Sequence, residues 1–154
     1  VVWRRSRDNS RTPMQWSEAE NAGFSKAEPW LKVNPNYQEI NVEENLKNDN
    51  SVFSFYKELI KLRKNSPYQE IIVDGKYQPL LELDPNLIAY LREKAGEKLI
   101  LVANFKNKEI DLNLDYQVKK IILSNYPDYD YRDLKNKKID YQLSPFETIL
   151  LKVK

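Results

Sequence analysis

The 154-residue sequence contains no histidine and no cysteine, and it has only three glycines. Without cysteine the chain forms no disulfide, no zinc–thiolate site and no thiol nucleophile, a composition that fits a cytoplasmic protein. Without histidine it has no Ser–His or Cys–His pair for nucleophilic catalysis. The glycines, at positions 23, 75 and 96, lack the spacing of a phosphate-binding loop, and no acidic cluster has EF-hand spacing. We therefore expect no cofactor and no metal.

An excess of charge of one sign is also lacking, since the formal net charge is +2. The longest basic clusters, at residues 4–5 and 135–138, are short or interrupted, so we expect no nucleic-acid partner. No window approaches the roughly 18 apolar residues of a membrane span, so we expect no membrane partner either. Met14 is the only methionine. Because no initiator residue begins the sequence, we expect an excised segment of a longer chain.

Residues 7–16 read RDNSRTPMQW and have neither helical nor strand periodicity. Arg7 and Arg11 bracket an Asp-Asn-Ser triplet that favours turns, and Pro13 fixes the backbone that follows. A run so rich in rigid residues and bidentate donors is typical of an ordered functional loop. The alternative is a packed connector.

The loop continues to about Tyr37, a length that is uncommon in a compact domain unless the loop is functional or disordered. Burial of its large aromatic side chains is expected to hold it in place. These side chains are Trp16, Phe24 and Trp30. Residues 39–46 then predict a short helical turn.

A clear amphipathic helix follows at residues 51–65, with Asn50 or Ser51 placed to cap its first turn. Pro67 stops the helix. Apolar residues recur at steps of three and four and predict a stripe that packs in a core. The stripe consists of Val52, Phe55, Tyr56, Leu59 and Leu62.

After Pro67 the hydrophobic period changes from 3.6 to 2, which is typical of β-strands. Turn signals such as Asp74-Gly75 and Ala95-Gly96 separate the strands, and another covers residues 84–86. Seven or eight short strands at this spacing predict an antiparallel β-sandwich instead of parallel βαβ units. The predicted strands are residues 70–73, 77–83, 87–93, 98–104, 109–114, 118–124, 139–143 and 148–153.

The RDNSRTPMQW motif is followed by NAGF at residues 21–24, PW at 29–30 and VNPNY at 33–37. Together these motifs closely resemble the α-glucosidases of the α-amylase superfamily, in particular oligo-1,6-glucosidases, dextran glucosidases and trehalose-6-phosphate hydrolases. The resemblance implies that residues 1–67 are the end of a (β/α)8 catalytic barrel, comprising the loop after its eighth strand and its final helix. Residues 68–154 would be the C-terminal antiparallel β-sandwich. We therefore expect a mainly-β chain in which a long loop and one barrel helix precede the sandwich.

A retaining glycosidase uses two carboxyl groups about 5 to 5.5 Å apart. The motifs that carry them in the resembled family are absent here, so we expect no catalytic residue in this part of a glycoside hydrolase that cleaves α-glucosidic bonds in short oligosaccharides. Loops after barrel strands form such active sites, so the motif loop is expected to face the sugar. By the resemblance, Arg11 helps to hold the non-reducing glucose, and Arg7 is the second candidate for substrate binding. For each arginine the alternative is an ion pair that only pins the loop.

The expected partners are the upstream catalytic barrel of the same parent chain and, for the parent enzyme, a small oligosaccharide or disaccharide phosphate. A helix that has lost its barrel exposes an apolar face, so we also expect self-association of the isolated segment. The alternative function is an independent carbohydrate-binding or scaffold β-sandwich. A row of exposed aromatic residues favours that alternative, and Tyr126, Tyr129 and Tyr131 in NYPDYDY are the candidates.

Overall fold

The computed structural model describes residues 7–81, 86–126, 131 and 134–154. The chain divides into two compact units, Val1–Glu58 and Leu59–Lys154, which we call the first and the second unit. Within the described ranges no helix is long and apolar enough to cross a membrane.

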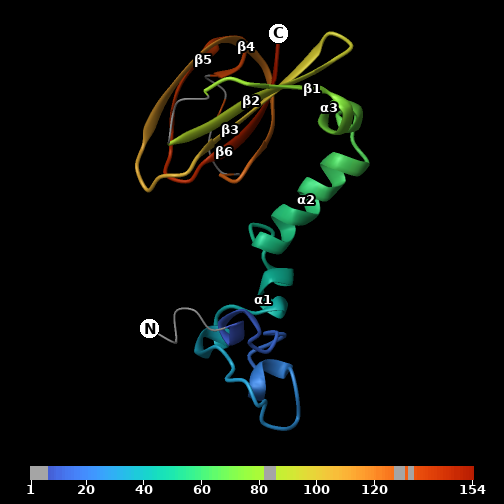
Figure 1. The fold of residues 1–154 in the computed structure, drawn as a ribbon, viewed down its shortest axis with the longest axis vertical. Coiled ribbons are helices and arrows are strands. Elements are labelled where there is room, and N and C mark those ends of the chain that lie inside the picture. Colours follow the sequence, from blue (N-terminus) through green and yellow to red (C-terminus); the bar gives the residue numbers. More distant parts are fainter. Residues whose placement is uncertain (1–6, 82–85, 127–130, 132–133) are drawn as a thin grey trace. The chain divides into compact units, whose positions relative to one another are not determined.

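Short turns and irregular backbone make up most of the first unit (Figure 1). Residues 7–37 are irregular, as their lack of periodicity predicted, and the helical turn predicted at residues 39–46 is the helix α1. The helical segments are the 3-10 turns η2 (Arg7–Ser10), η3 (Glu20–Gly23) and η4 (Pro35–Gln38) and the helix α1 (Val42–Lys47).

The predicted amphipathic helix is α2 (Val52–Lys64). Ser51 caps it, because the backbone N–H of Ser54 donates to Ser51 Oγ at 3.2 Å. No residue of α2 is buried, however, and Val52 and Tyr56 of the predicted stripe are 71% and 63% exposed. The prediction that this stripe packs in a core is therefore wrong for the described chain.

The second unit is an antiparallel sheet in the order β1-β2-β3-β6-β4-β5, preceded by one short helix. The mainly-β, antiparallel fold expected for this part of the chain is confirmed. Its elements are α3 (Gln69–Asp74), β1 (Lys76–Pro79), β2 (Leu87–Lys94), β3 (Glu97–Asn104), β4 (Ile110–Ser124), β5 (Lys138–Leu143) and β6 (Thr148–Val153).

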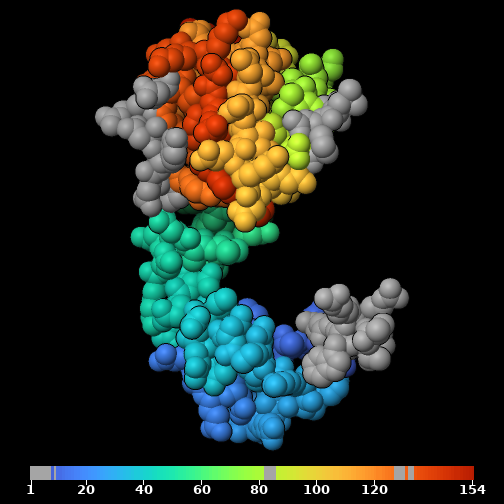
Figure 2. All heavy atoms as spheres, turned by 90° about the vertical axis from the view of Figure 1, so that its left-hand side faces the viewer, coloured from blue at the N-terminus to red at the C-terminus, as the bar shows by residue number. Residues whose placement is uncertain are grey.

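The strands predicted at residues 109–114 and 118–124 are one long strand, β4. Its first half pairs with β5 and its second half with β6, and the register shifts between Leu114 and Gln117 and again after Val118. Such bulges bend a strand. Figure 1 shows β4 curving from the side of β5 to the side of β6, and Figure 2 looks onto the side formed by β4 and β5. The two layers of the expected sandwich are thus made by one bent sheet.

The core lies between these two layers. Alternate residues of β6 are buried, which is the pattern of a strand with one face on the core. The strand β3, between β2 and β6, is buried on both faces at Leu99 and Ile100. The core residues are Leu87, Ala89, Leu91, Ile100, Val102, Leu112, Leu114, Val118, Leu134, Ile139, Leu143, Ile149, Leu151 and Val153.

The strand predicted at residues 70–73 is wrong, because this segment forms the helix α3. The backbone N–H of Ile72 donates to the carbonyl of Tyr68 at 2.9 Å, and Gly75 closes the helix by donating to Ile71 at 3.1 Å. A short apolar run with β-branched residues cannot be assigned by periodicity alone. Here burial of Ile71 decides in favour of a helix.

The turn predicted at Ala95-Gly96 is confirmed as a two-residue hairpin between β2 and β3. Both residues have positive φ, 51° and 78°, which this kind of turn requires. The turn predicted at residues 84–86 lies largely outside the described residues.

Candidate functional site

The RDNSRTPMQW loop is fixed to the N-terminus of α1. The carbonyl of Gln15 accepts a hydrogen bond from Val42 N–H at 2.9 Å, and that of Trp16 accepts one from Glu43 N–H at 3.1 Å. The Asn41 side chain caps the same turn, accepting from the backbone N–H of Glu44 at 2.9 Å. The first amides of a helix have no partner within it, so the loop supplies the acceptors that α1 needs.

The side chain of Gln15 adds a second connection across the first unit. Its Nε2 donates to Asn36 Oδ1 at 3.1 Å and to the backbone carbonyl of Ile40. Asn36 lies within the turn η4 and Ile40 follows it. One side chain therefore connects the motif loop to the VNPNY segment.

The NAGF segment has an unusual backbone conformation that turns the chain back onto the loop. Asn21, Ala22 and Gly23 are all left-handed, with φ of 53°, 58° and 65°. This conformation costs a residue with a Cβ about 1 to 2 kcal/mol. Two features of Ala22 offset that cost. Its side chain is fully buried, and its carbonyl accepts hydrogen bonds from Trp16 N–H at 2.8 Å and Ser17 N–H at 3.1 Å.

The two arginines of the motif lie in or beside the turn η2. The side chain of Arg11 is exposed, and its backbone N–H donates to the carbonyl of Asp8 at 3.1 Å. In the part of the chain that the structure describes, neither an ion pair nor a hydrogen bond engages the Arg11 guanidinium. Arg7 is the first residue of η2, but its side chain lies outside the described part.

The large aromatic residues of the loop were predicted to be buried, but they are exposed. Trp16 and Phe24 are about half exposed, and Trp30 is 87% exposed. Hydrogen bonds from Gln15 and Asn41 hold the loop instead. Asn41 carried a readable signal, since Asn followed three residues later by Glu is typical of a helix start, whereas nothing in the sequence singled out Gln15.

An apolar groove of about 520 Å³ opens between the motif loop and the start of α2. Apolar side chains from these two segments and from residues 40–42 line it, and most of them are exposed. They are Pro13, Met14, Ile40, Val42, Val52, Phe53 and Tyr56. Part of the predicted helix stripe therefore borders an open groove.

Acidic residues of the first unit do not converge on a site. Glu18, Glu20 and Glu39 are exposed, and Glu43 and Glu44 pair with Lys47, raising the pKa of its ammonium. Across the described residues there is no cluster of three or more metal-ligating side chains.

Of the three tyrosines proposed as a binding platform, the two that the structure describes direct their hydroxyls to other groups of the chain. Tyr126 donates its hydroxyl to the carbonyl of Pro145 at 2.6 Å, and Tyr131 donates to Glu147 Oε1 at 2.6 Å. Both rings are half-buried. Tyr129 lies outside the described residues.

Comparison with known families matches both parts of the chain. A model described as the α-amylase catalytic domain matches residues 1–75, and one described as the C-terminal domain of the α-amylase SusG matches residues 87–150. Together they leave only residues 76–86 and 151–154 unmatched. The chain belongs to the α-amylase superfamily.

Within this superfamily, the oligo-1,6-glucosidase of Bacillus cereus is 40% identical over 158 residues, covering 99% of this chain and 27% of that protein. The trehalose-6-phosphate hydrolase of Bacillus subtilis (strain 168) is 38% identical over 159 residues, with the same shares. The chain thus spans about a quarter of the length of these relatives.

Two solved structures of the superfamily are similar over nearly the whole chain. The isomaltulose synthase from Klebsiella sp. LX3 has a TM-score of 0.87 at 33% identity, covering 97% of this chain and 26% of that one. The trehalose-6-phosphate hydrolase of Bacillus licheniformis has a TM-score of 0.84 at 41% identity, covering 96% of this chain and 26% of that one.

Proposed function

We propose that the chain is the C-terminal part of a retaining α-glucosidase that cleaves α-glucosidic bonds in short oligosaccharides, of the oligo-1,6-glucosidase or trehalose-6-phosphate hydrolase type. The observation that carries this proposal is the exposed Arg11 guanidinium, which has no partner among the described residues, on a loop fixed at Gln15 and Trp16. A preorganised loop presents the planar donor group of an arginine at little entropic cost. The substrate is a small oligosaccharide or a disaccharide phosphate.

In this proposal Arg11 binds the sugar, and Arg7 contributes from the start of the same turn. Neither residue is catalytic; the carboxyl pair of the enzyme lies elsewhere in the parent protein. Among the described residues no ion pair or hydrogen bond engages the Arg11 guanidinium, so the group is open to a ligand. The kinetic test below distinguishes substrate binding from the ion-pair alternative.

We further propose that residues 1–67 complete the catalytic barrel and that residues 68–154 are the C-terminal domain. The apolar groove beside the motif loop then receives side chains from the rest of the barrel. Its exposed lining residues, Phe53 and Tyr56 among them, support this assignment, because an open apolar groove favours a covered state. In the isolated chain the same groove promotes self-association. A cytoplasmic location is part of the proposal, supported by the lack of cysteine.

Kinetics of two variants in the complete parent enzyme test the role of Arg11. Arg11→Ala is expected to lower kcat/KM for isomaltose or trehalose 6-phosphate about ten- to over a hundredfold, since one charge-assisted hydrogen bond contributes roughly 1.5 to 3 kcal/mol. Lys64→Ala, an exposed charge at the end of α2, serves as the matched control and should leave kcat/KM unchanged. An Arg11→Ala enzyme with a lowered Tm and wild-type kinetics would instead assign Arg11 to loop bracing.

A further inference from the structure

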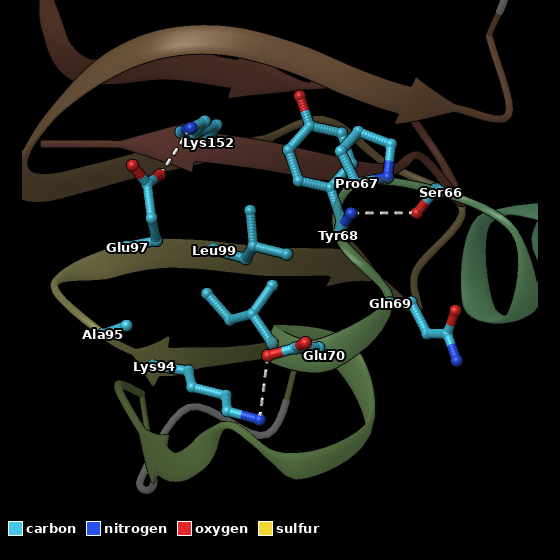
Figure 3. A pocket seen from close by; sticks show the side chains of 11 residues that line it. Ser66, Pro67, Tyr68, Gln69, Glu70, Lys94, Ala95, Glu97, Leu99 and Lys152 are labelled. Carbon is cyan, nitrogen blue, oxygen red and sulfur yellow. Dashed lines mark hydrogen bonds and ion pairs between the residues drawn. The ribbon is translucent and has the colours of Figure 1, made fainter.

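A second pocket, of about 580 Å³, opens on the second unit between the start of α3 and the strands β2, β3 and β6 (Figure 3). Its most buried lining residues are Ile71 and Leu99, so its inner surface is apolar. Pro67 and Tyr68 project beside this surface from the segment that leads into α3. The pocket therefore combines an apolar floor with one aromatic ring.

Two ion pairs border the pocket on either side of Leu99 (Figure 3). Lys152 pairs with Glu97 between β6 and β3, and Lys94 pairs with Glu70 at 3.2 Å between β2 and α3. The ammonium of Lys152 also lies 5.9 Å from the centre of the Tyr68 ring, so the ring and this ion pair face the same space.

Each ion pair joins one lysine to one carboxylate, so their charges balance. The hydrogen bond to Glu97 raises the pKa of Lys152, and Lys152 in turn lowers the pKa of Glu97. Glu70 raises the pKa of Lys94, which has Asp74 as a second partner at 3.4 Å. Two ammonium groups and two carboxylates line the pocket, so it has no net charge to attract an anion.

We propose that this pocket binds a neutral saccharide, with one sugar ring against Tyr68 and its hydroxyl groups bonded to the two ion pairs. A sugar ring has an apolar C–H face that packs on an aromatic ring. Its hydroxyls both donate and accept, so a lysine beside a carboxylate satisfies both functions. Because solvent-exposed ion pairs contribute little to stability, rearranging them around a ligand costs little.

The proposal goes beyond the proposed function, since the pocket lies in the second unit and does not use Arg11. Titration of the ¹⁵N-labelled 154-residue chain with isomaltose or trehalose tests it by amide chemical shifts. We expect saturable shifts at the residues that border the pocket. These are Ser66, Tyr68, Glu70, Lys94, Glu97, Leu99 and Lys152.

Variants identify the groups that bind. Tyr68→Ala is expected to weaken saccharide binding about tenfold or more, whereas Tyr68→Phe keeps the ring and stays within about threefold of wild type. Glu97→Gln should weaken binding severalfold. Tyr77→Ala removes an exposed aromatic residue of β1 outside the pocket and should have no effect. Amide spectra with wild-type dispersion establish that each variant is folded.

Three results would overturn the proposal. The first is the absence of saturable shifts at tens of millimolar disaccharide, and the second is shifts that persist unchanged in a folded Tyr68→Ala protein. The third is tighter binding of glucose 6-phosphate than of glucose, because the pocket would then act through its lysines as an anion site. None of these results bears on the kinetics of Arg11→Ala, so this inference and the proposed function fail separately.

Discussion

Different interactions stabilise the inside of each of the two units. Among its described residues, the second unit buries fourteen apolar side chains in one core. The described residues of the first unit bury only four side chains, two of them polar: Pro13, Ala22, Asn41 and Ser51. Hydrogen bonds to backbone groups shape the first unit, and its large apolar side chains remain exposed. A segment with its own core is stable alone, whereas one shaped only by hydrogen bonds depends on a surface that covers its apolar groups.

A pair of truncations in the 154-residue chain gives the largest expected difference between the units. Ile100→Ala removes a fully buried side chain of the second core and should destabilise the chain by about 2 to 5 kcal/mol. Phe53→Ala, at the exposed start of α2, should change stability by less than about 0.5 kcal/mol. Urea denaturation measures both.

The same pair sharpens the comparison when it is repeated in the complete parent enzyme. If the groove beside Phe53 is covered there, Phe53→Ala becomes clearly destabilising while the effect of Ile100→Ala stays the same. Equal costs for Phe53→Ala in the short chain and in the parent would contradict the covered groove.

The same contrast explains how much of the structure could be read from the sequence. Hydrophobic patterns predicted β2, β3, β5 and β6 nearly residue for residue, because these strands bury one face, or in β3 both faces, inside the second unit. The helix α2 was also readable from its period and cap. Its stripe was correctly located but wrongly assigned to a core, since periodicity shows which face is apolar and not what covers it.

The features that were predicted wrongly from the sequence have local physical causes. The segment at Ile71 looks like a strand because β-branched residues favour strands, and only the buried contact makes it a helix. The bulges that join two predicted strands into β4 leave no sequence signal at Leu114 or Gln117. In the candidate site, the irregular course of the loop was predictable from the motif, whereas the role of Arg11 stays a prediction. The role of Gln15 was not predictable, because it depends on contacts more than twenty residues away.

Two glycines of the second unit differ in what a side chain would meet, and they give the next largest effect. A Cβ at Gly75 would lie 2.3 Å from the carbonyl oxygen of Ile71, which is too close. An alanine there would therefore force the backbone at the end of α3 to shift. Gly75→Ala should therefore cost about 1 to 3 kcal/mol. Gly96→Ala meets no atom within 4 Å and bears only the strain of its positive φ of 78°, about 1 kcal/mol. Thermal unfolding ranks the two, and a Gly96→Ala protein less stable than Gly75→Ala would contradict the packing at α3.

The smallest expected effect is a pH dependence that belongs to the second unit alone. Glu147 is fully buried and accepts hydrogen bonds from Tyr131, Tyr141 and the backbone N–H of Ser144. Burial, together with the bond to Glu147, raises the pKa of the Tyr131 phenol. In the unfolded chain this phenol ionises at its ordinary pKa of about 10. Above that pH the unfolded state loses a proton that the folded state keeps, so stability present below about pH 10 is lost as the pH rises.

Tyr131→Phe removes the ionisable group, so Tm should fall less steeply above pH 10 than in the wild type, although Tm is lower at every pH because the bond to Glu147 is lost. Thermal unfolding between pH 8 and pH 11 measures the slope. Ile100→Val, which lowers Tm without touching this network, is the control for general destabilisation and should keep the wild-type slope. If Tyr131→Phe also keeps it, the alkaline sensitivity does not arise from this phenol. A shallower slope in Tyr131→Phe alone would place the pH response in the buried network of the second unit, where the first unit has no equivalent among its described residues.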